Sequence, residues 1–473
     1  MRKIVMLIVT LALAATLHAA DVVPLTAVNV GYRGDGSGIF PVTGVPTTWD
    51  VAKGTNVLWK ATLPERALSE PVVVGDRVLV AVEPEWLYCF DAATGKECWK
   101  AEVSALDGLD PAVQAKGRET LTKIIDLWKT GAAYNDPRYD AFKVDTDMIK
   151  KVAGIDVVRN GLFGNVGYAN GTPVSDGKYV WARFGTGSIG CYELATGNKV
   201  WLRKAPMQSG LVILGTQIAV IGDRLYLVED PPKGTSKALY KTSKQITGLD
   251  AATGKEVWHS KPIVRGNHGD GGGLVPVTVG GTVFLATSNG QVIDTVSGEV
   301  LISDLGNCGY STNAYALPDA VCYGFFRARL KNEGGKLVAV DLPLVPLISK
   351  LQEHAIVFGD LSYLAGSTGL GIRNPANRDL KHDEHDRLID SDKRSFSFGF
   401  KESSRQGGIL QSVVGGLLYC PAADGRLAVV KPGEKPELVA LNVFPEGIIA
   451  PCSAGGGRLF VRTVGALYAI GTK

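Results

Sequence analysis

Seven polar side chains are the candidates for a binding site in this sequence, and none of them forms a recognisable catalytic grouping. Guanidinium, amide, phenol, imidazole and carboxyl groups can together hydrogen-bond a small acidic or polyol ligand. The seven are Arg66, Asn165, Tyr168, His268, Asp270, Asn307 and Arg405. Taken singly, each is more often a loop residue that hydrogen-bonds locally. No Ser/His/Asp arrangement can be assembled, so no catalytic residue is predicted.

Two residue types that commonly bind metals are present without a convincing site. The string His382-Asp383-Glu384-His385-Asp386 has His-x-x-His spacing with carboxylates, but no apolar support surrounds it. We interpret it as a solvated loop, and we predict no metal site. Seven cysteines occur, an odd number, at 89, 98, 191, 308, 322, 420 and 452. No two are adjacent and no Cys-x-x-Cys occurs, which excludes haem attachment of that type.

The first 20 residues have the order of a secretory signal peptide. Met1-Arg2-Lys3 is basic, Ile4–Ala15 is almost wholly apolar, and small residues precede Asp21. The alternative is an uncleaved anchor, for which the apolar run is short. We therefore predict a signal peptide over 1–20, a single domain over 21–473, a periplasmic or secreted location, and no membrane span after cleavage. The net charge of +3 comes without a Lys/Arg-rich run, so no nucleic-acid partner is expected.

One short string recurs along the chain and predicts a β-hairpin. An acid is followed by Thr-Gly and then by a tryptophan eight residues after the acid. The copies are Asp91–Trp99, Glu193–Trp201 and Asp250–Trp258, with a weaker copy at Asp294–Ile302. Glycine permits the left-handed turn between two strands. We interpret Trp99, Trp201 and Trp258 as core residues between repeats rather than ligand contacts.

A second signal precedes each hairpin. Pairs of Gly, Asp or Pro join a short apolar strand to an alternating apolar run. They occur at 75–76, 176–177, 222–223, 280–281, 318–319, 359–360, 415–416 and 456–457. Eight third strands are expected to end near 91, 193, 250, 294, 341, 390, 431 and 471. Repeats of about 40–50 residues with four strands each are typical of β-propellers.

The predicted fold is therefore all-β, an eight-bladed β-propeller of four-stranded antiparallel blades. The last repeat has only three strands, and Asn56–Ala61, with Trp59, supplies the missing one and closes the ring. Long segments at 102–165, 229–246 and 366–387 are expected on the face opposite the tight turns. Segment 102–165 is predicted to be a partly helical insertion between the first two blades, with Asp110 as helix cap and Leu121, Ile124, Ile125 and Trp128 at helical spacing.

Cys89 and Cys98 flank the first Thr-Gly turn symmetrically. A regular hairpin brings such residues opposite each other, so we expect the two side chains to be close. Two outcomes stay open, a disulfide across the strands or a pair of packed free thiols.

The hairpin copies and the Gly-Asp turns resemble the PQQ-binding-like propeller repeat family. Residues 33–38 with Pro41, and 457–470 at the other end, are similar to the first and last segments of secreted members. One branch of that family, the quinoprotein dehydrogenases, binds pyrroloquinoline quinone (PQQ) with Ca²⁺ and typically carries an adjacent Cys-Cys pair. The sequence lacks that pair. The other branch, the lipoprotein of outer-membrane β-barrel assembly, is a non-enzymatic scaffold, but its lipidation cysteine is missing here.

The signal peptide and the resemblance together imply an exported, non-enzymatic scaffold without a cofactor. The long loops, gathered on one face, predict that it binds envelope or secreted proteins, or a small polar ligand, through that long-loop face. The alternative is a PQQ-dependent dehydrogenase that oxidises alcohols or sugars.

Overall fold

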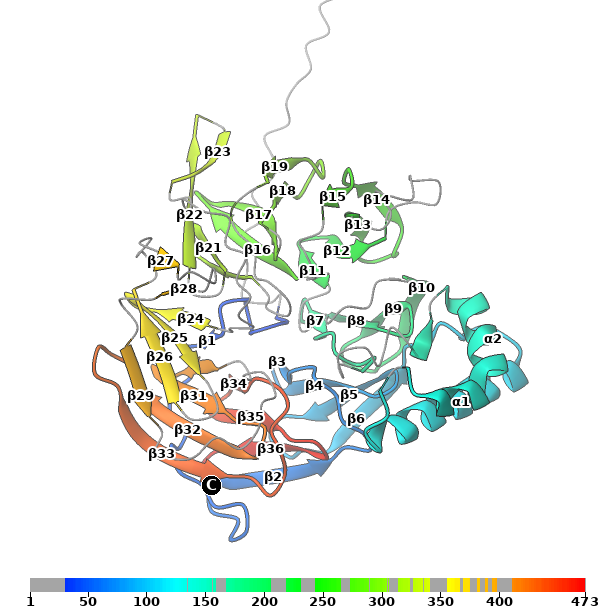
Figure 1. Ribbon diagram of the computed structural model, residues 1–473, viewed down its shortest axis with the longest axis horizontal. Coiled ribbons are helices and arrows are strands. Elements are labelled where there is room, and N and C mark those ends of the chain that lie inside the picture. The colour runs from blue at the N-terminus through cyan, green and yellow to red at the C-terminus, as the bar shows by residue number, and fades with distance from the viewer. Residues whose placement is uncertain are drawn as a thin grey trace, which may run out of the picture.

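A computed structural model describes residues 30–472 except 134, 155, 159–166, 206–217, 231–242, 265–272, 289, 304, 306–313, 324–325, 335, 341–354, 366–368, 375–380, 383–387, 390–393 and 398–410. Eight four-stranded antiparallel blades form a ring (Figure 1). The prediction of an eight-bladed β-propeller is confirmed. Among the described residues, no helix is long and apolar enough to span a membrane.

Each blade is a meander that begins at the ring axis. Blades 1 to 4 are β3–β6 (Val72–Val74, Arg77–Val82, Trp86–Asp91, Glu97–Glu102), β7–β10 (Val174–Ser175, Tyr179–Phe184, Ser188–Glu193, Lys199–Lys204), β11–β14 (Ile218–Ile221, Arg224–Glu229, Ser243–Asp250, Glu256–His259) and β16–β19 (Leu274–Val279, Thr282–Thr287, Val292–Asp294, Val300–Ile302). Blades 5 to 8 are β20–β23 (Tyr315–Leu317, Ala320–Tyr323, Phe326–Glu333, Lys336–Ala339), β24–β26 with β29 (Ala355–Phe358, Leu361–Ala365, Gly369–Arg373, Arg394–Ser397), β30–β33 (Ser412–Val414, Leu417–Pro421, Arg426–Lys431, Glu437–Val443) and β34–β36 with β2 (Ser453–Gly455, Arg458–Arg462, Ala466–Ile470, Val57–Thr62). Minor strands are β1 (Ile39–Phe40), β15 (Ile263–Val264), β27 (Lys381–His382) and β28 (Leu388–Ile389).

All eight predicted tight turns join the first strand of a blade to the second. In blade 1, Gly75 and Asp76 lie between β3 and β4, and the φ of Gly75 is +58°. A side chain with a Cβ adopts that backbone conformation only with strain, which explains the glycine. Because strands alternate in direction, these turns and the Thr-Gly turns lie on the same face of the ring, here called the tight-turn face.

The ring closes as predicted, through a strand from the start of the chain. Strand β2 is the outer strand of blade 8 and pairs antiparallel with β36, so that Trp59 faces Ala469. A strand near the start of the described chain and the last described strand thereby lie in one sheet.

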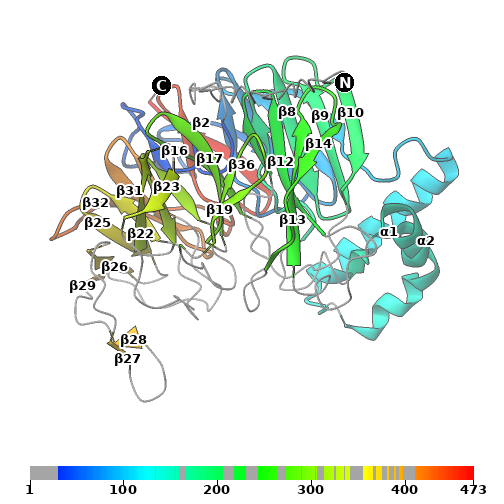
Figure 2. The same cartoon turned by 90° about the horizontal axis from the view of Figure 1, so that it is seen from above.

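The segment between blades 1 and 2 is helical, as expected. It contains α1 (Pro111–Lys129), the short 3-10 helix η1 (Pro137–Phe142) and α2 (Lys143–Ala153), beside the ring in Figure 2. The Asp110 side chain caps α1 by accepting the Ala112 N–H at 2.9 Å. The side chains predicted at helical spacing, ending with Trp128, form the buried face of α1.

Blades 5 and 6 differ from the prediction. The third strand of blade 5, β22, ends at Glu333, not near residue 341, and that of blade 6, β26, ends at Arg373, not near 390. The insertion of blade 6, which includes the β27–β28 hairpin, therefore lies between the third and fourth strands and not between the second and third. These blades lack the Thr-Gly turn, so the sequence offers no local mark for the strand end.

A β-bulge recurs in the outer hairpin of six blades. Each has a register shift at the residue just before the tryptophan position. The bulged residues are Leu58, Cys98, Val200, Val257, Leu301 and Val439. Five of these side chains are exposed, so the bulges account for exposed aliphatic residues on the outer strands. The extra residue turns the next side chain toward the neighbouring blade.

Candidate functional site

Neighbouring blades are joined by one repeated contact. In four blades the outer strand carries a tryptophan, and its ring lies against the glycine of the Thr-Gly or Ser-Gly turn of the next blade. A Cβ built on Gly197 would meet the Trp99 ring at 2.6 Å, and the Trp99 Nε1–H donates to the Leu194 carbonyl at 2.8 Å. Trp59 and Trp201 make the same kind of bond to Ala92 and Ala251. The sequence-predicted tryptophans thus lie between blades.

Within the hairpins, an acid occupies the last position of the third strand. Asp91 pairs with Arg77 in blade 1, Glu193 with Tyr179 in blade 2, and Asp250 with Arg224 in blade 3. The Asp91 carboxylate accepts the Thr94 hydroxyl at 2.7 Å, and its pKa is lowered by that bond. This acid holds the turn together.

Blade 5 departs from this arrangement at the same position. Ala320 pairs there with Arg329, so a cation stands in the place of the acid. Strand β22 does not turn after Arg329. It continues to Glu333 and returns as β23, and the Val340 N–H closes this longer hairpin on the Arg329 carbonyl at 2.9 Å.

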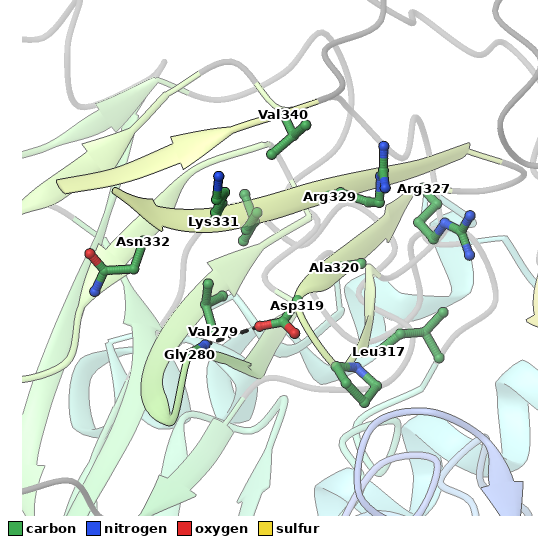
Figure 3. Close-up of a pocket in the computed structure, with 12 residues that line it drawn as sticks. Val279, Gly280, Leu317, Asp319, Ala320, Arg327, Arg329, Lys331, Asn332 and Val340 are labelled. Carbon is green, nitrogen blue, oxygen red and sulfur yellow. Dashed lines mark hydrogen bonds between the residues drawn. The ribbon is translucent and has the colours of Figure 1, made fainter. Parts of the chain in front are cut away.

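A groove of about 720 Å³ lies beside this hairpin, between blades 4 and 5. Its lining includes Val279 and Gly280 of blade 4, the turn from Leu317 to Ala320, and β22 (Figure 3). The Gly280 N–H donates to Asp319 Oδ1 at 3.0 Å and fixes the two turns to each other. We name it the blade 4–5 groove.

The cationic side of the groove is set by strand geometry. Arg327, Arg329 and Lys331 alternate along β22, so they share one face of the strand (Figure 3). Leu330, between them, is buried against blade 4. Arg329 and Lys331 are exposed, and Asp319 is the acidic residue of the lining. The cations of this groove are therefore suited to an anionic group.

A cavity of about 740 Å³ at the ring axis shares Gly280 and the Leu317–Asp319 turn with the groove. Its floor is the segment 30–41, which crosses the ring inside the innermost strands (Figure 1). Val30 bridges to Ser175 of blade 2, and β1 pairs with β30 of blade 7. The sequence marked this segment as a family feature but not as an axial strap.

The structure describes two of the seven predicted ligand residues, Arg66 and Tyr168. Asn165, His268, Asp270, Asn307 and Arg405 lie outside the described residues. Tyr168 is fully buried, and its hydroxyl donates to the Val157 carbonyl at 2.8 Å. The Arg66 guanidinium lies 4.6 Å from the centre of the Trp128 ring, at the base of the helical insertion.

Glu83 connects the two described residues of that set. Its carboxyl oxygens accept the N–H groups of Tyr168 and Ala169, at 3.0 and 2.9 Å. Burial raises the pKa of Glu83 to about 8, against the opposing effect of these bonds and of nearby Arg66 and Arg462. This cluster ties the loop before blade 2 to blade 1.

Two further buried carboxyls were not singled out from the sequence. Burial raises the pKa of Glu70 to about 8 and that of Glu85 to about 7. Glu70 accepts the Arg33 backbone N–H and so anchors the axial strap to blade 1. Arg33, itself 2% exposed, lies over the ring of Tyr315 at 4.9 Å. Sequence gives no signal for these roles, because Arg33, Glu70 and Glu85 lie in polar loops.

A family model described as outer membrane protein assembly factor BamB matches residues 43–135 and 242–304. No curated protein matches the sequence.

Similar solved structures include BamB from Moraxella catarrhalis, at 11% identity over 93% of this chain and 97% of that one, with a TM-score of 0.37. A quinohemoprotein alcohol dehydrogenase from Comamonas testosteroni is 14% identical over 88% and 76%, with a TM-score of 0.41. A europium-containing methanol dehydrogenase is 12% identical over 87% and 85%, with a TM-score of 0.45. The repeated hairpins and the matching family model identify the chain as a β-propeller built from PQQ-like repeats.

Proposed function

We propose that this chain is an exported, non-enzymatic scaffold that binds an acidic, extended segment of a protein partner in the blade 4–5 groove. The observation that carries the proposal is the charge reversal at Arg329, where blades 1 to 3 have an acid. A partner carboxylate above β22 would complement the exposed cations that this strand presents to the groove.

Two further features support a peptide over a small ligand. The groove is open and continues into the axial cavity, which gives a long surface rather than an enclosed pocket. Exposed cations guide an acidic segment to the site, while Leu317 and Val340 give it apolar contacts. The matched family is described as an assembly factor, which fits a protein partner. The proposed site is on the tight-turn face, and it therefore differs from the long-loop face that the sequence analysis favoured.

The binding test uses a defined probe. A short fluorescein-labelled peptide of alternating glutamate and tyrosine is titrated with the purified chain, beside a peptide in which lysine replaces glutamate. We expect binding of the acidic peptide alone, weakened by salt because exposed charges are screened. The affinity of the variant R329E/K331E for the acidic peptide should be lower by about tenfold or more.

A matched control is available on the same face. Lys96 and Lys255 are exposed and lie in the Thr-Gly turns of blades 1 and 3, so K96E/K255E changes the same net charge away from the groove. It should leave the affinity unchanged. Equal loss in both variants would show a nonspecific charge effect and would refute the groove.

The enzymatic alternative is tested separately. The chain is incubated with PQQ and Ca²⁺, and oxidation of alcohols and aldoses is assayed with an artificial electron acceptor. Robust turnover would make the protein an oxidoreductase and overturn the scaffold proposal.

Export rests on the order of residues in 1–20, which lie outside the described part of the chain. The mass of the mature protein should correspond to cleavage near residue 20. An intact Met1–Ala20 on a cytoplasmic protein would contradict export.

A further inference from the structure

Cys89 and Cys98 lie on the two strands of the first Thr-Gly hairpin. Cys89, on β5, pairs with Trp99, and Cys98 is the bulged residue just before that tryptophan. A bulge sets two residues of one strand against one of the other, so Cys98 and Trp99 both face Cys89. Both cysteines are free thiols, and after burial the nearby Cys98 side chain is the next cause that raises the pKa of the Cys89 thiol.

The two thiols differ in access. The Cys89 side chain is fully buried between blades 1 and 2, with Trp99 and Leu194 in the same apolar cluster. Cys98 is exposed at the rim, where its thiol contacts the Lys96 carbonyl at 3.8 Å. A reagent in solution can therefore reach one thiol directly and the other only through it.

Blade 2 provides an internal comparison. Cys191 pairs with Trp201, as Cys89 pairs with Trp99, and it is equally buried. The bulged residue there is Val200. Blades 1 and 2 thus share the buried thiol, and blade 1 adds the exposed one.

From this juxtaposition we propose that Cys89 and Cys98 are a redox-active dithiol, which closes to a disulfide by exchange with a small-molecule disulfide. The Cys98 thiolate attacks one sulfur of the incoming disulfide and releases one thiol, leaving a mixed disulfide on Cys98. Cys89 then loses its proton to solvent and attacks the Cys98 sulfur, which releases the second thiol. Two protein thiols are oxidised and one disulfide is reduced to two thiols.

The second step is the slow one. Burial, with a further contribution from Cys98, raises the pKa of Cys89 well above its ordinary value, so little thiolate is present at neutral pH. We therefore expect the mixed disulfide on Cys98 to accumulate first and to convert faster as pH rises.

The experiment exposes the native full chain to mixtures of oxidised and reduced glutathione, quenches with acid, unfolds it and alkylates the remaining thiols. Trypsin cuts after Lys96, between the two cysteines, so a disulfide appears as two linked peptides in the mass spectrum. We expect that linked pair, with Cys191 alkylated throughout.

The variant C98V copies blade 2 and should leave Cys89 as inert as Cys191. Persistent glutathione on Cys98 with Cys89 still alkylated would refute the dithiol, and so would two unreacted thiols in fully oxidised glutathione. Neither result bears on the blade 4–5 groove, because the hairpin belongs to blade 1.

Discussion

Glu83 is a carboxyl that the fold removes from water and places beside two backbone N–H groups. Burial raises its pKa in the folded chain to about 8, from the ordinary value of 4.5. Between these values the folded chain keeps a proton that the unfolded chain has lost. The stabilising contribution is therefore complete below about pH 4.5 and is lost as pH rises through about 8.

The variant E83Q keeps the shape of the side chain and removes this titration. Between about pH 4.5 and pH 8, we expect the free energy of unfolding of the wild type to fall relative to that of E83Q. The fall should be a few kcal/mol at most, because one pKa unit corresponds to about 1.4 kcal/mol. Denaturant unfolding at several pH values measures it. E437Q, at an exposed position on β33, is the control. Parallel pH profiles for E83Q and wild type would contradict the prediction.

Residue chemistry was the part least predictable from sequence. Arg66 and Tyr168 were chosen as loop polar groups. Both are hydrogen-bonded to Glu83, which looks like any other loop acid in the sequence. Burial of Glu70 and Glu83 arises from contacts with residues 33 and 168–169, far along the chain. A local pattern contains no information about such contacts.

At the scale of the element, the Thr-Gly hairpin is both a turn and a docking surface. Gly197 has a φ of +74° and lies against the Trp99 ring, so an added Cβ brings backbone strain and a clash together. Gly416 has a φ of +83° with open space around it. We expect G416A to destabilise by about 1 kcal/mol and G197A by about 3 kcal/mol.

Denaturant midpoints of the two glycine variants separate strain from packing. Equal losses would mean that the tryptophan contact contributes little and that the turn conformation alone requires glycine.

Elements with a chemical mark were predicted well, and unmarked ones were not. All eight turns between first and second strands were found, because Gly, Asp and Pro set their geometry. The bulge beside Trp99 was missed, since an extra residue in a strand leaves no signature in alternating polarity. The ends of β22 and β26 were missed because the Thr-Gly turn is absent from blades 5 and 6. In blade 5, the same absence produces the longer hairpin beside the blade 4–5 groove.

At the scale of the whole molecule, ring closure depends on β36, which separates β2 from β35. A chain ending at Thr463 lacks β36 and leaves β2 without a partner. We expect it to lose cooperative thermal unfolding and to aggregate through the exposed edge. A chain ending at Gly471 keeps the strand and should unfold like the full-length protein. Cooperative unfolding of the shorter chain would show that closure is dispensable.

The pairing of β2 with β36 also sets an order of events during synthesis. Blades 1 to 4 each consist of strands close together in sequence, so they can form as the chain emerges. In contrast, Trp59 of β2 can pair only after Ala469 of β36 has been synthesised. Loop closure over such a separation is slow compared with local pairing. The nascent molecule is thus an open arc for almost the whole time of its production, with an unpaired strand at its leading end. Any factor that protects the unfinished chain has to shield that edge until β36 has been made.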